Sequence, residues 1–142
     1  MGARHAGRQA ALQMLFQAEL GRFDVDQTTA DFWRHFEADP DGRQYADSLV
    51  RGVVVRREEI DGLITKASAN WRIERMTAVD RNVLRIGTFE LLVETATPRA
   101  VILDEAVELA KQFGAENSGP FVNGVLDRVA VLLNRVDRDR QG

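Results

Sequence analysis

Two basic residues near the start of the chain are spaced to act together on a negatively charged ligand. Arg4 and Arg8 lie four residues apart, so a helix places both guanidinium groups on one face. Guanidinium groups bind phosphate through paired hydrogen bonds, and no acidic residue precedes Glu19. Phe16 lies two turns beyond Arg8 and offers a ring to an unstacked base, although it also suits a helix core. The spacing therefore indicates a candidate phosphate-binding and base-binding face.

A second mixture of basic and aromatic side chains lies in the middle of the chain. Residues 70–75 read NWRIER, and Arg81 and Arg85 lie on the helix predicted to follow. Trp71 suits an apolar anchor between helical units, and the arginines suit a solvated face. The same mixture is also typical of surfaces that bind single-stranded nucleic acid, so both interpretations stay open.

No pattern in the sequence assembles a catalytic or metal site. A phosphate-binding loop of the Walker type, a His-Glu-x-x-His helix and a nucleophile elbow are all absent from the sequence. Asp104 and Glu108 lie one turn apart, but such a pair is also an ordinary solvated face. Asp39 and Asp41 lack the later Glu that a calcium loop requires. We therefore expect a binding protein without cofactor or metal rather than an enzyme.

Composition limits the remaining classes. The chain has 142 residues, 44% of them hydrophobic, which is enough for one domain with its own core. A net charge of -3 argues against a protein that coats nucleic acid through bulk charge, so a basic site must be local. The sequence has no cysteine, no signal-peptide core and no apolar run near the roughly 18 residues of a membrane span. We expect a cytoplasmic protein.

Apolar residues recur at steps of three and four along most of the chain, which predicts an all-α fold. The first helix carries Phe16 in its apolar stripe and ends at Gly21, and a turn is predicted at residues 39–42. The predicted helices cover residues 10–20, a segment capped by Thr28 or Thr29 and ending at 36, about 45–68, a helix from 77, 98–113, and 118–136. Residues 137–142 are expected to fray.

Local signals mark several of these helix ends. Thr77 has the spacing of a capping residue, Pro98 suits a first turn, and Gly114 suits the position after a helix. Asn117 or Ser118 is expected to cap the last helix. Gly124 in the middle of that helix has two interpretations: close approach of a neighbouring helix, or contact with a ligand or partner.

Four stretches in order resemble the NusB family of bacterial transcription antitermination factors. They are residues 3–16, residues 71–91 with DRNVLRI, residues 97–111 with EAVELAK, and residues 113–127 with FVNGVLD. The resemblance extends over nearly the whole chain. It implies a single all-helical domain, residues 1–142, of six to seven helices in two packed subdomains, about 3–70 and about 71–136.

The resemblance also implies a function without catalysis. NusB-like proteins pair with NusE, a small-subunit ribosomal protein, and the pair binds boxA RNA and starts an antitermination complex on RNA polymerase, notably in ribosomal RNA operons. Carried over by position, the implied RNA contacts are Arg4, Arg8, Phe16, Asn117, Ser118 and Phe121, with weaker contacts to RNA or NusE from Arg81 and Arg85. Asp80 matches an acidic position expected to face NusE.

Two positions depart from the family pattern. Phe16 stands where a tyrosine is common, and Asn117 stands where an aspartate is common. Two alternatives also stay open. One is a homodimer that buries its own RNA surface, and the other is the accessory domain of a ribosomal RNA methyltransferase. The 142 residues contain no cofactor-binding unit for the methyl transfer itself.

Overall fold

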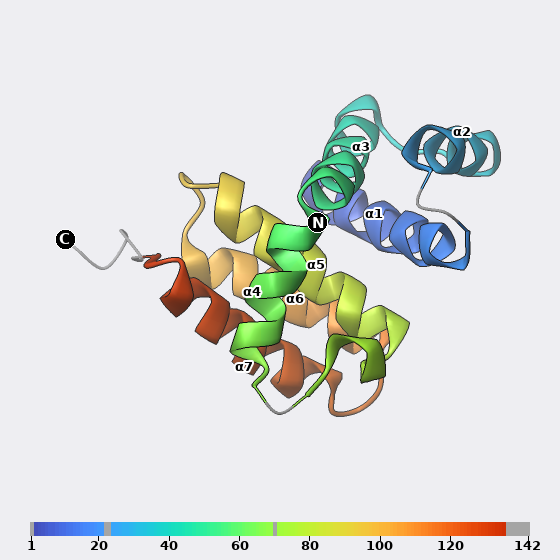
Figure 1. The fold of residues 1–142 in the computed structure, drawn as a ribbon. Coiled ribbons are helices and arrows are strands. Elements are labelled where there is room, and N and C mark those ends of the chain that lie inside the picture. The colour runs from blue at the N-terminus through green and yellow to red at the C-terminus, as the bar shows by residue number, and fades with distance from the viewer. Residues whose placement is uncertain (1, 22–23, 70, 136–142) are drawn as a thin grey trace. The chain divides into compact units, whose positions relative to one another are not determined.

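Helices form nearly all of the regular structure in the computed structural model, which describes residues 2–21, 24–69 and 71–135. In chain order the elements are α1 (Ala3–Leu20), α2 (Val25–His35), α3 (Pro40–Val55), α4 (Arg57–Ala67), the short 3₁₀ helix η1 (Ile73–Arg75), α5 (Ala78–Val93), α6 (Arg99–Phe113) and α7 (Ser118–Leu132). The predicted all-α fold is confirmed (Figure 1). Among the described residues, no helix has both the length and the apolar character needed to cross a bilayer.

The chain divides into two units, Met1–Arg56 and Arg57–Gly142. The sequence analysis placed the boundary near residue 70. The structure places it earlier because α4 packs against α5 and α7, which belong to the second unit. The predicted helix over about 45–68 is therefore two helices, which separate at Arg56, where the backbone leaves helical geometry (φ -102°, ψ 22°).

In the N-terminal unit, α1 lies along α3 and α2 contacts both helices. Their facing sides bury Leu15, Phe32 and Leu49. The two long helices meet closely at Gly7, where an added Cβ would lie 3.0 Å from the carbonyl oxygen of Gly42. Because this contact needs a residue without a side chain, Gly7 fixes how near the start of α1 lies to the start of α3.

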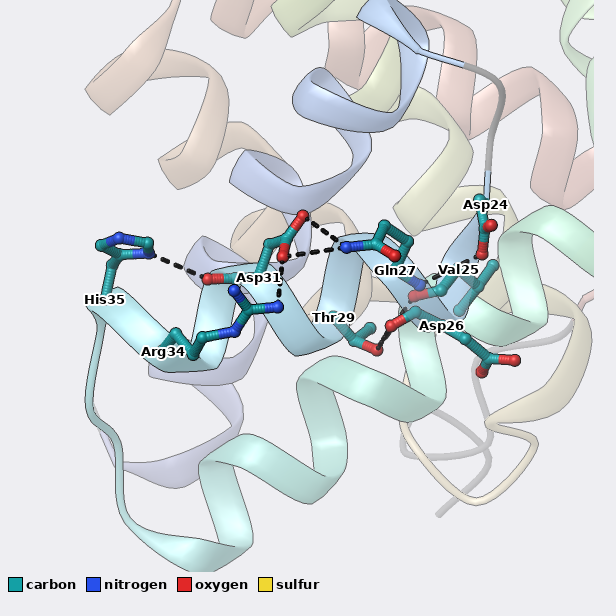
Figure 2. A network of polar contacts seen from close by, with 8 residues as sticks. All are labelled: Asp24, Val25, Asp26, Gln27, Thr29, Asp31, Arg34 and His35. Carbon is teal, nitrogen blue, oxygen red and sulfur yellow. Dashed lines mark hydrogen bonds and ion pairs between the residues drawn. The ribbon is translucent and has the colours of Figure 1, made fainter.

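Helix α2 begins earlier than predicted because Asp24 caps it. The Asp24 carboxylate accepts a hydrogen bond from the backbone N–H of Gln27 at 3.1 Å (Figure 2). Further along, the Asp31 carboxylate accepts from the Gln27 amide at 3.0 Å and from Arg34 at 2.7 Å. Thr29, one of the two predicted caps, lies inside the helix, where its hydroxyl donates to the carbonyl oxygen of Val25 at 2.9 Å.

Three other local predictions need correction. Residues 39–42 do not form a separate turn, because Pro40 is the first residue of α3. Phe16 lies outside the buried stripe of α1, with an exposed fraction of 42%. The last helix ends at Leu132 rather than at 136. Residues 136–142 and Asn70 lie outside the described residues.

In the C-terminal unit, α5 is the central helix, and α4, α6 and α7 all pack against it. Every residue from Asn82 to Leu91 is buried. Thr77 caps its start by accepting from the N–H of Asp80 at 3.1 Å, as predicted. A helix buried on all sides has no solvated face, so its polar side chains must find partners inside the protein.

Arg85 carries a charge and has only 3% of its surface exposed, so it needs a hydrogen-bonded partner inside the protein. Its Nε and Nη2 atoms donate to the two carboxylate oxygens of Asp61 on α4, at 2.9 and 3.0 Å. Its Nη1 atom donates to Asn82 at 3.0 Å. This paired, fork-like geometry compensates for burial of the charge and joins α4 to α5.

Glycines set two other close contacts in the C-terminal unit. A Cβ added at Gly87 would lie 2.6 Å from Cδ1 of Leu126, so α5 and α7 approach each other there. A Cβ at Gly114 would lie 2.6 Å from the hydroxyl of Ser118, and its φ of -102° is not left-handed. Crowding rather than backbone conformation therefore requires glycine at position 114. Gly124, for which close helix approach was one interpretation, meets only Arg128 at 3.9 Å.

A pair of glycine replacements tests the α5–α7 contact. Gly87→Ala forces its new methyl group against Leu126, and overpacking of a core costs about 1–3 kcal/mol of unfolding free energy. The control is Gly62→Ala in α4, where a Cβ meets nothing within 4 Å and helix propensity predicts a gain of up to about 1 kcal/mol. Urea denaturation measures both. Equal effects of the two replacements would contradict the proposed crowding.

A second pair tests the buried ion pair. Asp61→Asn leaves the Arg85 guanidinium buried without its carboxylate, so we expect a loss of about 3 kcal/mol. Arg57 also approaches Asp61, at 3.7 Å, but its side chain is 43% exposed. Arg57→Ala should therefore cost less than about 1 kcal/mol. Similar losses for both variants, measured by denaturation at one salt concentration, would show that burial of Arg85 does not dominate.

Candidate nucleic-acid interface

The basic residues at the start of α1 gather around one aromatic ring. The guanidinium carbons of Arg4 and Arg8 lie 4.9 and 5.6 Å from the centroid of the Tyr45 ring, which belongs to α3. A cation over the face of an aromatic ring is attracted by its electron density. The close approach of α1 and α3 at Gly7 brings the three side chains together.

Arg4 and Arg8 do not have the same access to solvent. Arg4 is exposed, whereas 4% of the surface of Arg8 is exposed. A cleft of about 400 Å³ borders Arg4 and Tyr45, and its other lining residues are Ala3, Gln44, Ser48 and the acidic Asp41. The structure therefore places Arg4 where a phosphate can reach it, and places Arg8 beneath it as a support for the Tyr45 ring.

Phe16 lies further along the same helix with 42% of its surface exposed. Its ring is accessible to solvent, so Phe16 is not the core residue that its place on the apolar stripe suggested, and its contact with a base stays a prediction. Leu20, one turn further along, is also exposed.

In the C-terminal unit, a cavity of about 710 Å³ lies between the end of α4, the loop before α5 and the start of α7. Its lining residues include Lys66, Trp71, Arg75, Asp80, Asn117, Phe121, Gly124 and Arg128. The cavity walls are tied together by hydrogen bonds. Arg128 on α7 donates to the carbonyl oxygen of Ala67 at 2.8 Å, and the N–H of Trp71 donates to the carbonyl oxygen of Ser68 at 2.6 Å.

The three contact residues predicted at the start of α7 differ in their exposure to solvent. Asn117 is the N-cap residue, is exposed and lines the cavity, and Phe121 is half-buried on the same wall. Ser118 is buried, and its hydroxyl accepts a hydrogen bond from the N–H of Ala115 at 2.9 Å. Ser118 therefore closes the turn between α6 and α7, so its hydroxyl does not face an external ligand.

Arg81 and Arg85 are occupied by contacts inside the protein. Arg81 donates to the carbonyl oxygen of Met76 at 2.7 Å, and Arg85 is the buried partner of Asp61. The predicted RNA contact by Arg85 is corrected on this ground, because a guanidinium that is 3% exposed does not reach an external phosphate.

Asp80 has one carboxylate oxygen that is buried without a hydrogen-bond donor among the described residues. Its side chain is 9% exposed, lines the cavity, and has a buried carboxylate oxygen, Oδ1, without a hydrogen-bond partner among the described residues. A buried polar atom of this kind costs free energy until a donor reaches it. Asp80 therefore contributes one acidic side chain to the cavity wall, while its Oδ1 atom, being buried, is not itself accessible to a group from outside the chain.

The sequence analysis missed three residues that the structure brings to these sites. None of Tyr45, Lys66 and Arg128 was a candidate binding residue from the sequence alone. A signal was available for Arg128, which follows Phe121 by seven residues and so lies on the same helical face. Among the described residues, no three side chains of His, Asp or Glu lie close enough to hold a metal ion.

Comparison with known proteins gives matches to the NusB family over nearly the whole chain. The NusB family model matches residues 5–131. The transcription antitermination protein NusB of Sorangium cellulosum is 60% identical over 140 residues, which are 99% of this chain and 100% of that protein. The corresponding protein of Myxococcus xanthus is 50% identical over 139 residues, 95% of this chain and 99% of its own.

Solved structures agree with the fold. T. maritima NusB superposes with a TM-score of 0.82 at 39% identity, over 92% of both chains. A chain from the crystal structure of antitermination factors NusB and NusE in complex with dsRNA gives a TM-score of 0.80 at 29% identity, over 92% of this chain and 97% of its own. With matches of this length in both sequence and structure, the chain belongs to the NusB family.

Proposed function

We propose that this protein is an RNA-binding transcription antitermination factor. With NusE it binds boxA RNA and nucleates an antitermination complex on RNA polymerase, notably in ribosomal RNA operons. The observation that carries the proposal is the similarity over the full length of antitermination proteins, at 60% identity to one of them. A structural neighbour that contains NusB, NusE and RNA supports the choice of partners.

The exposed residues in the candidate interface support specific roles in RNA binding. Arg4, held over Tyr45, is the phosphate contact that we propose for the N-terminal unit, with Phe16 as a ring beside the bases. Asn117 and Phe121 are the corresponding contacts that we propose for the C-terminal unit. Arg8, Ser118, Arg81 and Arg85 act through the fold that positions these residues.

Asp80 is the residue that we propose for the contact with NusE. Its side chain lines the cavity of the C-terminal unit and is the one acidic side chain among the residues that line it, so it suits a basic or N–H donor group of the partner. The protein acts as an adaptor and catalyses no reaction in this proposal. Because bacterial transcription takes place in the cytoplasm, we place it there.

Binding of a short single-stranded boxA RNA tests this function. Fluorescence anisotropy of labelled RNA is measured with the protein alone and with NusE, over a series of salt concentrations, with a scrambled RNA as control. We expect a preference for boxA that depends on NusE. Equal affinity for both RNAs in the mixture, or a homodimer that persists with NusE in sedimentation, would contradict the adaptor function.

The same salt series separates the two arginines of α1. Arg4→Ala removes an exposed charge, so the slope of log affinity against log salt should fall by about 0.7, the value for one phosphate contact with a single strand. Arg8→Met removes a charge that is nearly inaccessible, so we expect a smaller change of slope. A larger change for Arg8 would show that the buried guanidinium reaches the RNA.

Asn117→Asp tests whether the start of α7 faces RNA. The substitution places a negative charge at an exposed position proposed to lie beside phosphates. Binding should weaken more at low salt than at high salt, because mobile ions screen the repulsion. Equal weakening at all salt concentrations would contradict the electrostatic explanation.

A further inference from the structure

The cavity in the C-terminal unit has two aromatic rings on its walls. Trp71 is 52% exposed although it is among the largest apolar side chains, and Phe121 is half-buried on α7. The volume, about 710 Å³, lies within the range of roughly 300–1,000 Å³ that is usual for small-molecule sites. Two accessible rings in a hollow of this size form a site for a flat, unsaturated group.

Charge around the cavity favours a negatively charged ligand. Lys66, Arg75 and Arg128 line it, and Asp80 is the one acidic residue among its lining residues. Lys66 and Arg75 are exposed, whereas the only acid is buried. Since the chain as a whole carries a charge of -3, this local excess of cations is opposite to the overall charge.

The wall formed by α7 is open at Gly124. A Cβ at this position would meet nothing closer than the Arg128 guanidinium at 3.9 Å, so no neighbouring helix explains the glycine. Without a side chain, the backbone of α7 is accessible to a planar group lying between the rings. Of the two interpretations of Gly124, this geometry leaves contact with a ligand or partner.

We propose that this cavity receives one unstacked base of single-stranded RNA, which stacks on Trp71 beside Phe121 while Lys66 and Arg75 contact the flanking phosphates. Stacking on aromatic side chains is the usual way in which proteins hold unpaired bases, and it tolerates any base. The inference rests on the proposed RNA-binding function and adds to it a base-binding site at Trp71.

The alternative occupant is an apolar side chain of a protein partner. Such a side chain needs the rings but does not need three cations around them. The combination of rings and cations therefore favours RNA, and a partner side chain is an outcome that the experiment distinguishes.

Tryptophan fluorescence reports the stacking directly. The chain has two tryptophans, so Trp33→Phe leaves Trp71 as the single indole. Trp33 lies in the N-terminal unit and donates to Asp47, and circular dichroism checks that the variant stays folded. Adding single-stranded boxA RNA, with NusE present, should quench Trp71 emission with the same midpoint as the anisotropy of labelled RNA.

Replacement of Trp71 gives a second measurement. Trp71→Leu keeps an apolar side chain but loses the ring, so RNA affinity should fall by about tenfold while the salt slope stays unchanged. Trp71→Phe restores a ring and should recover most of the affinity. Phe36→Leu is the control, because Phe36 is an aromatic residue of similar exposure, 48%, in the N-terminal unit.

The results separate this inference from the proposed function. RNA binding of normal affinity without quenching of Trp71 would overturn the base site and leave the antitermination function intact. Quenching or a spectral shift with NusE alone, and no further change with RNA, would assign the cavity to the protein partner and overturn it as well. Absence of RNA binding even with NusE would overturn both.

Discussion

The C-terminal unit depends on the burial of residues 82–91 of α5. Because residues 82–91 have no solvated side, a charged group on this stretch needs a partner from the protein itself, whereas the Thr88 hydroxyl is buried without a hydrogen-bond partner among the described residues. Arg85 finds one in Asp61, and that paired contact fixes α4 against α5. The close approach at Gly87 then fixes α7. One buried helix thus determines where the surrounding helices lie.

The same arrangement creates the candidate ligand surface. With α4 and α7 both held against α5, their ends form the walls of the cavity, and Arg128 joins the walls through the carbonyl oxygen of Ala67. The cap of α5 at Thr77 leaves Asp80 at the edge of the same cavity. Residues that contact a ligand are therefore positioned by residues that do not.

Sequence periodicity predicted the helices well where core and surface alternate, and a local signal predicted the cap at Thr77. Asn117, one of the two residues expected to cap the last helix, occupies the N-cap position of α7, but its side chain makes no capping hydrogen bond. The periodicity did not predict the break between α3 and α4 at Arg56. No glycine or proline marks this break in the sequence, and it arises because α4 packs against α5 and α7. The burial of Arg8 and Arg85 was not predicted either. The spacing of arginines along a helix is the same whether the side chain faces solvent or, like Arg85, a partner 24 residues away in the sequence. Asn117 and Asp80 became candidate contact residues only through the family resemblance. Helical periodicity did not indicate them, because the residues around them come from other helices and are known only from the fold.

The stacking of Arg4 on Tyr45 has a consequence for the entropy of binding. An exposed arginine normally samples many rotamers and loses that freedom on contact, at a cost of about 0.5–1.5 kcal/mol for each such side chain. A guanidinium already held 4.9 Å from a ring has fewer conformations to lose. A protein with net charge -3 attracts RNA weakly at long range, so it benefits most from a basic group that is ordered before RNA arrives.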